Sequence, residues 1–243
     1  MAIRGLKHRA VLLDALGTLL ELQPPAPRLR AELAGRFDLA ISQSQAERAI
    51  AAEIAYYRQH LDEGRDEAGL ADLRRRCAAA LSHELAGSLG QKLPSVQEMT
   101  DALLASLSFR VFDDVLPTLR ALKDLGLRLI VVSNWDVSLP GVLDHLGLSA
   151  SLAGVLTSAQ AGFRKPHPAI FDLALRLAQA RAEEAIHVGD SLEEDVAGAR
   201  AAGLEPVLIR RSGPGPGGVP VIRTLEELPA LLSGPRLAPL SGL

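Results

Sequence analysis

The sequence predicts an α/β fold, in which a parallel sheet is flanked by helices and an all-helical domain is inserted after the first strand. Two observations predict this fold. In the second half of the chain, short runs of Val, Ile and Leu alternate with longer helical patterns, as expected for parallel strands joined by right-handed crossovers. Between the first run and the second, residues 22–108 contain helical patterns and no convincing strand.

Five apolar runs are predicted to form the strands of the sheet, at residues 10–14, 127–133, about 153–157, 185–189 and 204–209. The last four runs are flanked by predicted helices at residues 115–125, 139–146, 168–180 and 192–202. Gly126, Gly147 and Gly203 follow three of these helices, where a left-handed residue commonly ends a helix. A closing helix is expected over residues 224–232, with Thr224 as its N-cap and Glu227 completing a capping box.

The insert is predicted to contain helices at residues 28–37, 43–61, 70–86 and 96–107, because apolar residues recur there three and four positions apart. We interpret residues 22–108 as a second, smaller domain at the carboxyl-terminal edge of the sheet, and residues 1–21 and 109–243 as the core. One continuous α+β domain is the alternative.

The composition is that of a soluble globular protein of 243 residues, with 48% hydrophobic and 23% charged residues. A net charge of −3 gives no electrostatic reason to expect nucleic acid or an anionic membrane as a partner. No run approaches the ~20 apolar residues of a membrane span, and no pattern in the chain indicates an oligomeric state.

Cysteine use and the first residues indicate the compartment. Cys77 is the single cysteine, so no intrachain disulfide can form, a reducing compartment is expected, and the thiol is expected to pack within a helix. Asp14 interrupts the apolar stretch that follows Arg4, Lys7 and Arg9, which argues against a secretory signal. A cytoplasmic location is therefore expected.

Polar residues occur at four positions that end or follow the predicted strands of the sheet. Asp14 closes the first apolar run, and Ser133 ends the second. Lys165 precedes a proline in the loop after the third run, and Asp190 and Asp195 follow the fourth. Taken singly, each residue has a structural explanation as a turn residue, a strand-end cap, a solvated lysine or a helix cap. Because open α/β sheets bind ligands at the carboxyl ends of their strands, the ordered set favours a reaction centre with Asp14 as nucleophile.

The residue types at these positions suit phosphoryl chemistry. A carboxylate that attacks phosphorus or carbon forms a covalent intermediate, which water then hydrolyses. With a phosphate, the carboxylate approaches a dianion, so a divalent cation with lysine and hydroxyl donors is needed. Mg²⁺ prefers hard oxygen ligands, which Asp14, Asp190 and the backbone carbonyl of Leu16 can supply if the two strands are adjacent. Lys165 would then pair with nucleophile and phosphate, and Ser133 would donate to a phosphoryl oxygen.

The four positions resemble the motifs of the haloacid dehalogenase superfamily of hydrolases, over nearly the whole chain. That family's first motif, Asp-x-Asp-Gly-Thr after an apolar strand, reads Asp14-Ala-Leu-Gly-Thr18 here, and its second, a strand ending in Ser or Thr, is matched by Ser133 with Asn134. The third is matched by Lys165-Pro166, and the fourth by Gly189-Asp190 through Asp195. The helical insert corresponds to the family's alpha-helical class 1 cap.

The resemblance implies a Rossmann-like core with a mobile cap domain, Mg²⁺ as cofactor, an aspartyl-phosphate intermediate and, most often, phosphatase activity on a small phosphorylated metabolite. It also implies the site. The expected catalytic residues are Asp14, Ser133 and Lys165; the substrate contacts are Ser133, Asn134 and Lys165; the metal ligands are Asp14, Asp190 and the carbonyl of Leu16; and the supporting residues are Asp195, Gly17 and Thr18.

Leu16 departs from the family's pattern, because phosphatases of this family carry a second Asp there, which protonates the leaving oxygen and then activates water. Losing one general acid–base group costs ~10²–10⁴ in rate. Leu16 also fits a 2-haloacid dehalogenase, since halide leaves without a proton, but those enzymes need no metal and lack the Gly189-Asp190 pair. A non-catalytic protein that binds a phosphorylated ligand is a further alternative, as is a phospho-accepting receiver domain, against which the helical insert argues. Metal-dependent phosphoryl chemistry is the interpretation we favour.

Overall fold

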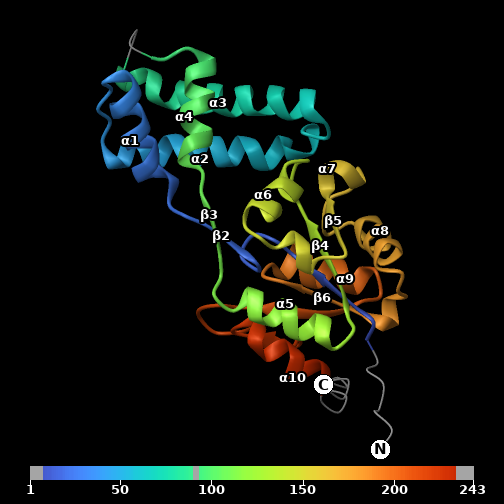
Figure 1. Cartoon of the computed structure of the whole chain (residues 1–243). Coiled ribbons are helices and arrows are strands. Elements are labelled where there is room, and N and C mark those ends of the chain that lie inside the picture. Colours follow the sequence, from blue (N-terminus) through green and yellow to red (C-terminus); the bar gives the residue numbers. More distant parts are fainter. Residues whose placement is uncertain (1–7, 90–92, 234–243) are drawn as a thin grey trace, which may run out of the picture. The chain divides into compact units, whose positions relative to one another are not determined.

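The computed structural model describes residues 8–89 and 93–233 (Figure 1). Within them the chain forms two compact units. The core unit comprises the described residues of Met1–Glu21, Val111–Asn134 and Leu139–Leu243. The helical unit comprises those of Leu22–Arg110 together with Trp135–Ser138.

A six-stranded parallel sheet, in the order β5-β4-β1-β6-β7-β8, organises the core unit. Its strands are β1 (Ala10–Leu13), β4 (Arg128–Ser133), β5 (Gly154–Thr157), β6 (Ala185–Gly189), β7 (Glu205–Ile209) and β8 (Val221–Ile222). β1 pairs with β4 on one side and with β6 on the other. The carboxyl ends of β1, β4 and β6 therefore lie next to one another, at the edge where α/β sheets bind ligands.

Helices cover both faces of this sheet. They are α5 (Val115–Asp124), α6 (Leu139–His145), α7 (Ser158–Ala161), α8 (Pro168–Ala178), α9 (Gly198–Ala201) and α10 (Leu228–Ser233). α8 and α9 share a core with alternate residues of β1 and β4, including Leu12, Ile130 and Val132. α5 packs on β4 and against α10 (Figure 1). Two covered faces explain why the central strands are continuous apolar runs rather than alternating ones.

The predicted elements of the core unit are confirmed, with two differences; one is that the closing helix begins as a 3₁₀ turn, Leu225–Glu227, before α10. All five predicted strands form, and Gly126, Gly147 and Gly203 have φ of +80°, +75° and +75° as helix-ending residues. The predicted helix at residues 192–202 instead begins as a π-helical turn, Leu192–Ala197, before α9. The carbonyl of Ser191 accepts hydrogen bonds at 3.1 Å from the N–H groups of both Asp195 and Val196, which widens this turn. At the chain's closing helix, the N–H of Thr224 donates to the carboxylate of Glu227 at 3.0 Å, as the capping box requires.

The helical unit consists of α1 (Pro25–Phe37), α2 (Gln43–His60), a 3₁₀ turn (Leu61–Glu63), α3 (Glu67–Leu89) and α4 (Val96–Ser106). The starts of α2 and α4 follow from sequence, because Ser42 and Ser95 accept from backbone N–H groups three residues on, in capping boxes with Gln45 and Glu98. Among the described residues, no helix is both long enough and apolar enough to cross a membrane.

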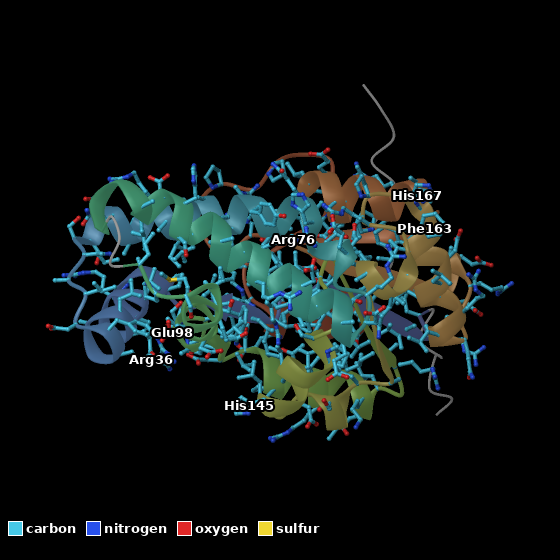
Figure 2. All side chains as sticks on the ribbon, turned by 90° about the horizontal axis from the view of Figure 1, so that it is seen from above. Arg36, Arg76, Glu98, His145, Phe163 and His167 are labelled. Carbon is cyan, nitrogen blue, oxygen red and sulfur yellow. The ribbon has the colours of Figure 1, made fainter. Side chains whose placement is uncertain are left out.

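The helices of this unit bury a core of their own, which includes Leu29, Leu33, Ile50, Leu73, Leu81, Met99 and Leu103. Cys77 is buried there as well, and burial next to Glu53 raises the pKa of its thiol, so it acts as a packing residue. Apart from the buried Glu53, charged side chains such as Arg36 and Glu98 lie on the outer surface (Figure 2), and Arg36 pairs with Glu32 at 2.6 Å.

Three short strands are not predicted by the sequence: β2 (Leu20–Leu22), β3 (Phe109–Val111) and β8. β2 and β3 pair where the chain passes from one unit to the other and back. Trp135–Ser138, which the sequence places with the core, clusters with the helical unit. Asp136 accepts a hydrogen bond from the hydroxyl of Tyr57 at 2.9 Å, and the N–H of Val137 donates to the carbonyl of Gly64 at 2.9 Å. These contacts join residues far apart in the chain, so local sequence patterns carry no signal for them.

Candidate active site

Asp14 follows the last residue of β1 and is buried in the middle of the sheet edge. The loop after it closes tightly, because the N–H groups of Leu19 and Leu20 both donate to the carbonyl of Ala15 at 2.8 Å. Gly17 has φ +86°, which residues with a Cβ rarely adopt. The strand end and this turn together fix where the Asp14 carboxylate lies.

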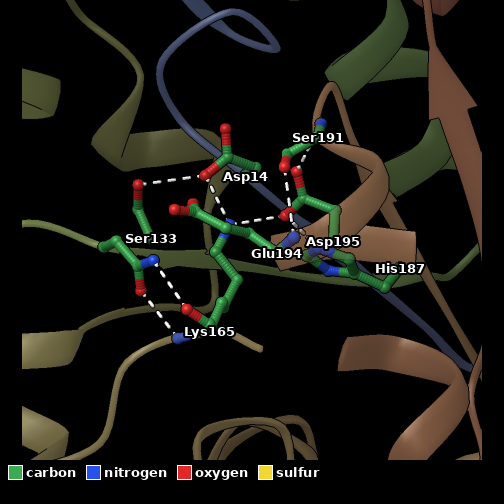
Figure 3. A network of polar contacts seen from close by, with 8 residues as sticks. Asp14, Ser133, Lys165, His187, Ser191, Glu194 and Asp195 are labelled. Carbon is green, nitrogen blue, oxygen red and sulfur yellow. Dashed lines mark hydrogen bonds and ion pairs between the residues drawn. The ribbon is translucent and has the colours of Figure 1, made fainter. Parts of the chain in front are cut away.

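Lys165 and Ser133 both contact Asp14 (Figure 3). Lys165 Nζ donates to Asp14 Oδ1 at 2.7 Å and to Asp195 Oδ1 at 2.6 Å, and Ser133 Oγ donates to the same Asp14 oxygen at 3.0 Å. Lys165 is only 2% exposed, so carboxylates rather than water balance its charge. The structure thus brings the three predicted catalytic residues into direct contact.

Asn134 holds the backbone of Lys165. Its Nδ2 donates to the carbonyl of Lys165 at 3.0 Å, and its Oδ1 accepts from the N–H of Lys165 at 2.7 Å. The sequence predicts Asn134 as a substrate contact, whereas both ends of its side-chain amide are engaged in placing the lysine. In this structure Asn134 is a positioning residue.

The two carboxylate oxygens of Asp195 accept hydrogen bonds from three donors. Besides Lys165, its Oδ1 accepts from His187 Nε2 at 2.8 Å, and its Oδ2 accepts from the N–H of Ser191 at 3.0 Å. His187 is completely buried, with its ring edge-on to Phe171 at 5.0 Å. The π-helical turn brings Asp195 to these donors, so its supporting role consists of holding the Lys165 ammonium group together with Asp14.

Asp190 lies at an exposed position directly after β6. A Cβ at Gly17 would overlap its carboxylate, and a Cβ at Gly189 would overlap that of Asp195, so both glycines permit close approach of a carboxylate. Carboxylate oxygens of Asp14, Asp190 and Asp195 lie within 4.8 Å of one another. Asp14 and Asp190 can hold one metal ion only if their strands are adjacent, and β1 and β6 do pair.

These neighbours shift the pKa values of the site. Burial raises the pKa of Asp14, and the charge of Lys165 offsets this only in part. Partial burial and the charges of Asp14 and Asp195 raise the pKa of Asp190 to about 6. Burial opposes ionisation of Asp195 too, but Lys165 and His187 outweigh it and hold the pKa of Asp195 well below its usual range.

Lys165 and Glu194 complete the electrostatics of the site. Although burial disfavours its charge, the pKa of Lys165 is raised because Asp14 and Asp195 stabilise the ammonium group. Partial burial raises the pKa of Glu194, whose carboxyl group is hydrogen-bonded by Asn134. Asp14 and Asp195 pair directly with Lys165, and the carboxyl groups of Asp190 and Glu194 are near enough for its charge to favour their ionised forms.

Leu16 and Thr18 differ in their surroundings. Leu16 is 37% exposed, two residues after Asp14, and its side chain has no proton to donate. Thr18 is buried, and its carbonyl accepts a hydrogen bond from Arg211 at 2.7 Å. Four residues of the site were not predicted from the sequence: His187, Ser191, Glu194 and Arg211. The first three lie within or beside the fourth motif, which could have indicated them, whereas no motif includes Arg211.

Comparison with known proteins identifies the family. The profile of the haloacid dehalogenase-like hydrolases matches residues 8–203, which includes every residue of the site described above except Arg211. The chain belongs to this hydrolase family. The resemblance inferred from the four motifs is therefore confirmed, and the sheet with its flanking helices is the core fold of a haloacid dehalogenase-like hydrolase.

Two curated relatives match part of the chain. The chain is 38% identical over 123 residues to haloacid dehalogenase-like hydrolase domain-containing protein 3 of Bos taurus, which covers 51% of this chain and 48% of that protein. It is 40% identical over 106 residues to the glyceraldehyde 3-phosphate phosphatase of Methanopyrus kandleri, which covers 41% and 43%. The matched segment thus spans about half the length of these relatives or less.

Solved structures match over a greater length. A 2-haloacid dehalogenase from Pseudomonas syringae pv. Tomato DC3000 has a TM-score of 0.65 at 25% identity and covers 93% of this chain and 98% of its own. A phosphatase of the same family from Thermococcus onnurineus has a TM-score of 0.63 at 26% identity and covers 94% and 100%. The fold is thus shared by members with both kinds of name.

Proposed function

We propose that this hydrolase is a metal-dependent phosphatase, which acts on a small phosphorylated metabolite through an aspartyl-phosphate intermediate. The observation that carries the proposal is the group of three carboxylates, Asp14, Asp190 and Asp195, within 4.8 Å of one another beside a single lysine. Like charges this close repel unless a cation offsets them. Attack on a neutral carbon–halogen bond gives no reason for an additional exposed carboxylate, whereas attack on a phosphate dianion does.

The donor set of Asp14 and Asp190 fits Mg²⁺, because both offer hard oxygen atoms, with the carbonyl of Leu16 as the proposed third ligand. When bound, the ion supplies positive charge that favours the ionised form of Asp14 and lowers its repulsion from the phosphate. Asp195 is less suited to ligation, since Lys165, His187 and Ser191 already donate to its two oxygens.

The side chains of the site supply the rest of the chemistry. A carboxylate oxygen of Asp14 attacks phosphorus, the bond from phosphorus to the leaving oxygen breaks, and Lys165 and Ser133 stabilise the phosphoryl oxygens as they stabilise Asp14 in this structure. Water then attacks the aspartyl-phosphate, releasing inorganic phosphate and the free carboxylate. In both steps the proton moves to or from solvent, because Leu16 cannot carry it.

We further propose that the helical unit is the cap that selects the substrate, since in such an architecture the core performs the chemistry and an inserted domain chooses the ligand. The phosphatase name of the Methanopyrus kandleri relative supports a phosphorylated three-carbon compound, or one of similar size, as the substrate class.

A second candidate function is 2-haloacid dehalogenation. Leu16 favours it, because halide leaves without a proton, and a dehalogenase is among the structures of the same fold. The two functions predict different products from the same nucleophile.

The deciding experiment measures phosphate release from p-nitrophenyl phosphate and chloride release from 2-chloropropionate, each with Mg²⁺ and with a chelator. We expect phosphate release that requires Mg²⁺ and is absent in Asp14→Asn. Chloride release without metal would replace the proposal with the dehalogenase. Absence of both, with a rise in melting temperature on adding phosphate, would indicate a binding protein without turnover.

A further inference from the structure

Arg211 lies in the glycine- and proline-rich stretch after β7. Three different nitrogens of its guanidinium group donate to three oxygens. Nη2 donates to the carbonyl of Thr18 at 2.7 Å, Nε to the carbonyl of Gly17 at 3.4 Å, and Nη1 to Oδ2 of Asp114 at 2.9 Å. Two of these three acceptors belong to the loop that carries the proposed nucleophile.

The guanidinium group is itself held in place. Its central carbon lies 3.6 Å from the centroid of the Phe112 ring, a cation–π contact. Oδ2 of Asp114 also accepts from the N–H of Leu225 at 2.7 Å, so the carboxylate that anchors Arg211 is fixed by the closing helix. A planar group with five donors suits this arrangement, and the single ammonium of lysine cannot reproduce it.

Arg211 binds two backbone carbonyls of the nucleophile loop that take no part in the hydrogen bonds of the loop's own turn. The N–H groups of Gly17, Leu19 and Leu20 bond within the loop, while the carbonyls of Gly17 and Thr18 bond to Arg211. Gly17 faces Asp190 so closely that a Cβ would overlap the carboxylate. A shift of these carbonyls would therefore move Gly17 and alter the space between Asp14 and Asp190.

The same side chain also reaches the returning linker. Gly17 and Thr18 precede the crossing into the helical unit near Glu21, and Phe112 and Asp114 follow the crossing back near Val111. Arg211 thus fixes both connecting segments at their core ends.

We propose that Arg211 is a positioning residue for the nucleophile loop: by holding the carbonyls of Gly17 and Thr18, it sets the loop opposite Asp190 and so determines metal affinity and turnover. The consequence for catalysis rests on the proposed function, whereas the consequence for the loop does not.

The test compares Arg211→Gln and Arg211→Lys with a matched control, Arg181→Gln, which replaces an exposed arginine of the core unit that pairs with Glu183 and Glu184. Amide hydrogen exchange of the peptide spanning residues 15–20 reports on the loop, and calorimetric Mg²⁺ titration and kcat at saturating Mg²⁺ report on the site. We expect faster loop exchange in Arg211→Gln and a loss of ~10- to 100-fold in metal affinity or kcat, as for other partners that orient metal ligands. Arg211→Lys should lie between Arg211→Gln and the wild type, and the control should match the wild type.

Unchanged loop exchange in a folded Arg211 variant would overturn the proposal, as would a lower melting temperature with Mg²⁺ affinity and kcat both intact. If Arg211→Gln fails to fold, Arg211→Lys answers the same question. Failure of the proposed function looks different: the wild type would release no phosphate with any metal, while loop exchange would still respond to Arg211.

Discussion

Replacing Leu16 with aspartate tests whether a missing general acid explains this site. The side chain of Leu16 is already 37% exposed, so the substitution should change the free energy of unfolding by only about 0.5 kcal/mol. The loop around it is held by the bonds of Leu19 and Leu20 to Ala15, and the new carboxyl would lie on the same turn as Asp14. Burial and the charges of Asp14 and Asp195 raise the pKa of Asp190; the same carboxylates would raise that of the new side chain, which suits an acid that must hold a proton near neutral pH.

We expect Leu16→Asp to increase kcat for alkyl phosphates by ~10²-fold, equivalent to ~2.7 kcal/mol of transition-state stabilisation. Aryl phosphates should gain far less, because their leaving groups depart as anions. The assay is phosphate release from a matched alkyl and aryl pair at saturating Mg²⁺, and Leu16→Asn, which has nearly the same shape but no acidic proton, is the control. Rates unchanged from the wild type for both substrates, in a Leu16→Asp variant that folds and binds Mg²⁺, would refute the reasoning, as would an equal gain in Leu16→Asn.

Three further predictions address the nucleophile, the metal and a buried carboxyl. Asp14→Asn should lower kcat by at least ~10³-fold while the circular dichroism spectrum stays unchanged; activity within tenfold of the wild type would place the nucleophile elsewhere. Mg²⁺ at ~100 times its Kd should stabilise the wild type by about 2.7 kcal/mol, and Asp190→Asn should lose this shift in thermal unfolding, whereas the exposed Asp172→Asn should keep it. Burial raises the pKa of Glu53 from 4.5 to about 7, so folding favours its protonated form and stability should fall by about 3 kcal/mol as pH rises from 4.5 to 7. Glu53→Gln should remove this fall and be the more stable protein at pH 8 in urea unfolding; parallel pH profiles would contradict the prediction.

Much of the core fold follows from local patterns. The runs that become β1, β4 and β6 are recognised because they are short, almost wholly apolar and followed by polar or turn residues, and left-handed glycines such as Gly126 mark the helix ends. Asp14, Ser133 and Asp190 could be placed together because each ends or follows a strand, and the carboxyl ends of parallel strands meet at one edge. The short strands β2, β3 and β8 and the π-helical turn at Leu192–Ala197 were not predictable, since pairing and hydrogen bonds beyond a few residues determine them.

The sequence by itself therefore determined the type of chemistry: which residues end the strands, which of them are carboxylates, and that Leu16 stands where an acid is expected. Tertiary structure decided what each side chain does. Only the folded chain directs Asn134 to the backbone of Lys165, His187 to Asp195, and Arg211 to the carbonyls of Gly17 and Thr18, nearly 200 residues away. The physical reason is that spacing along a strand or helix fixes where a side chain starts, whereas its partners come from whichever distant elements pack against it.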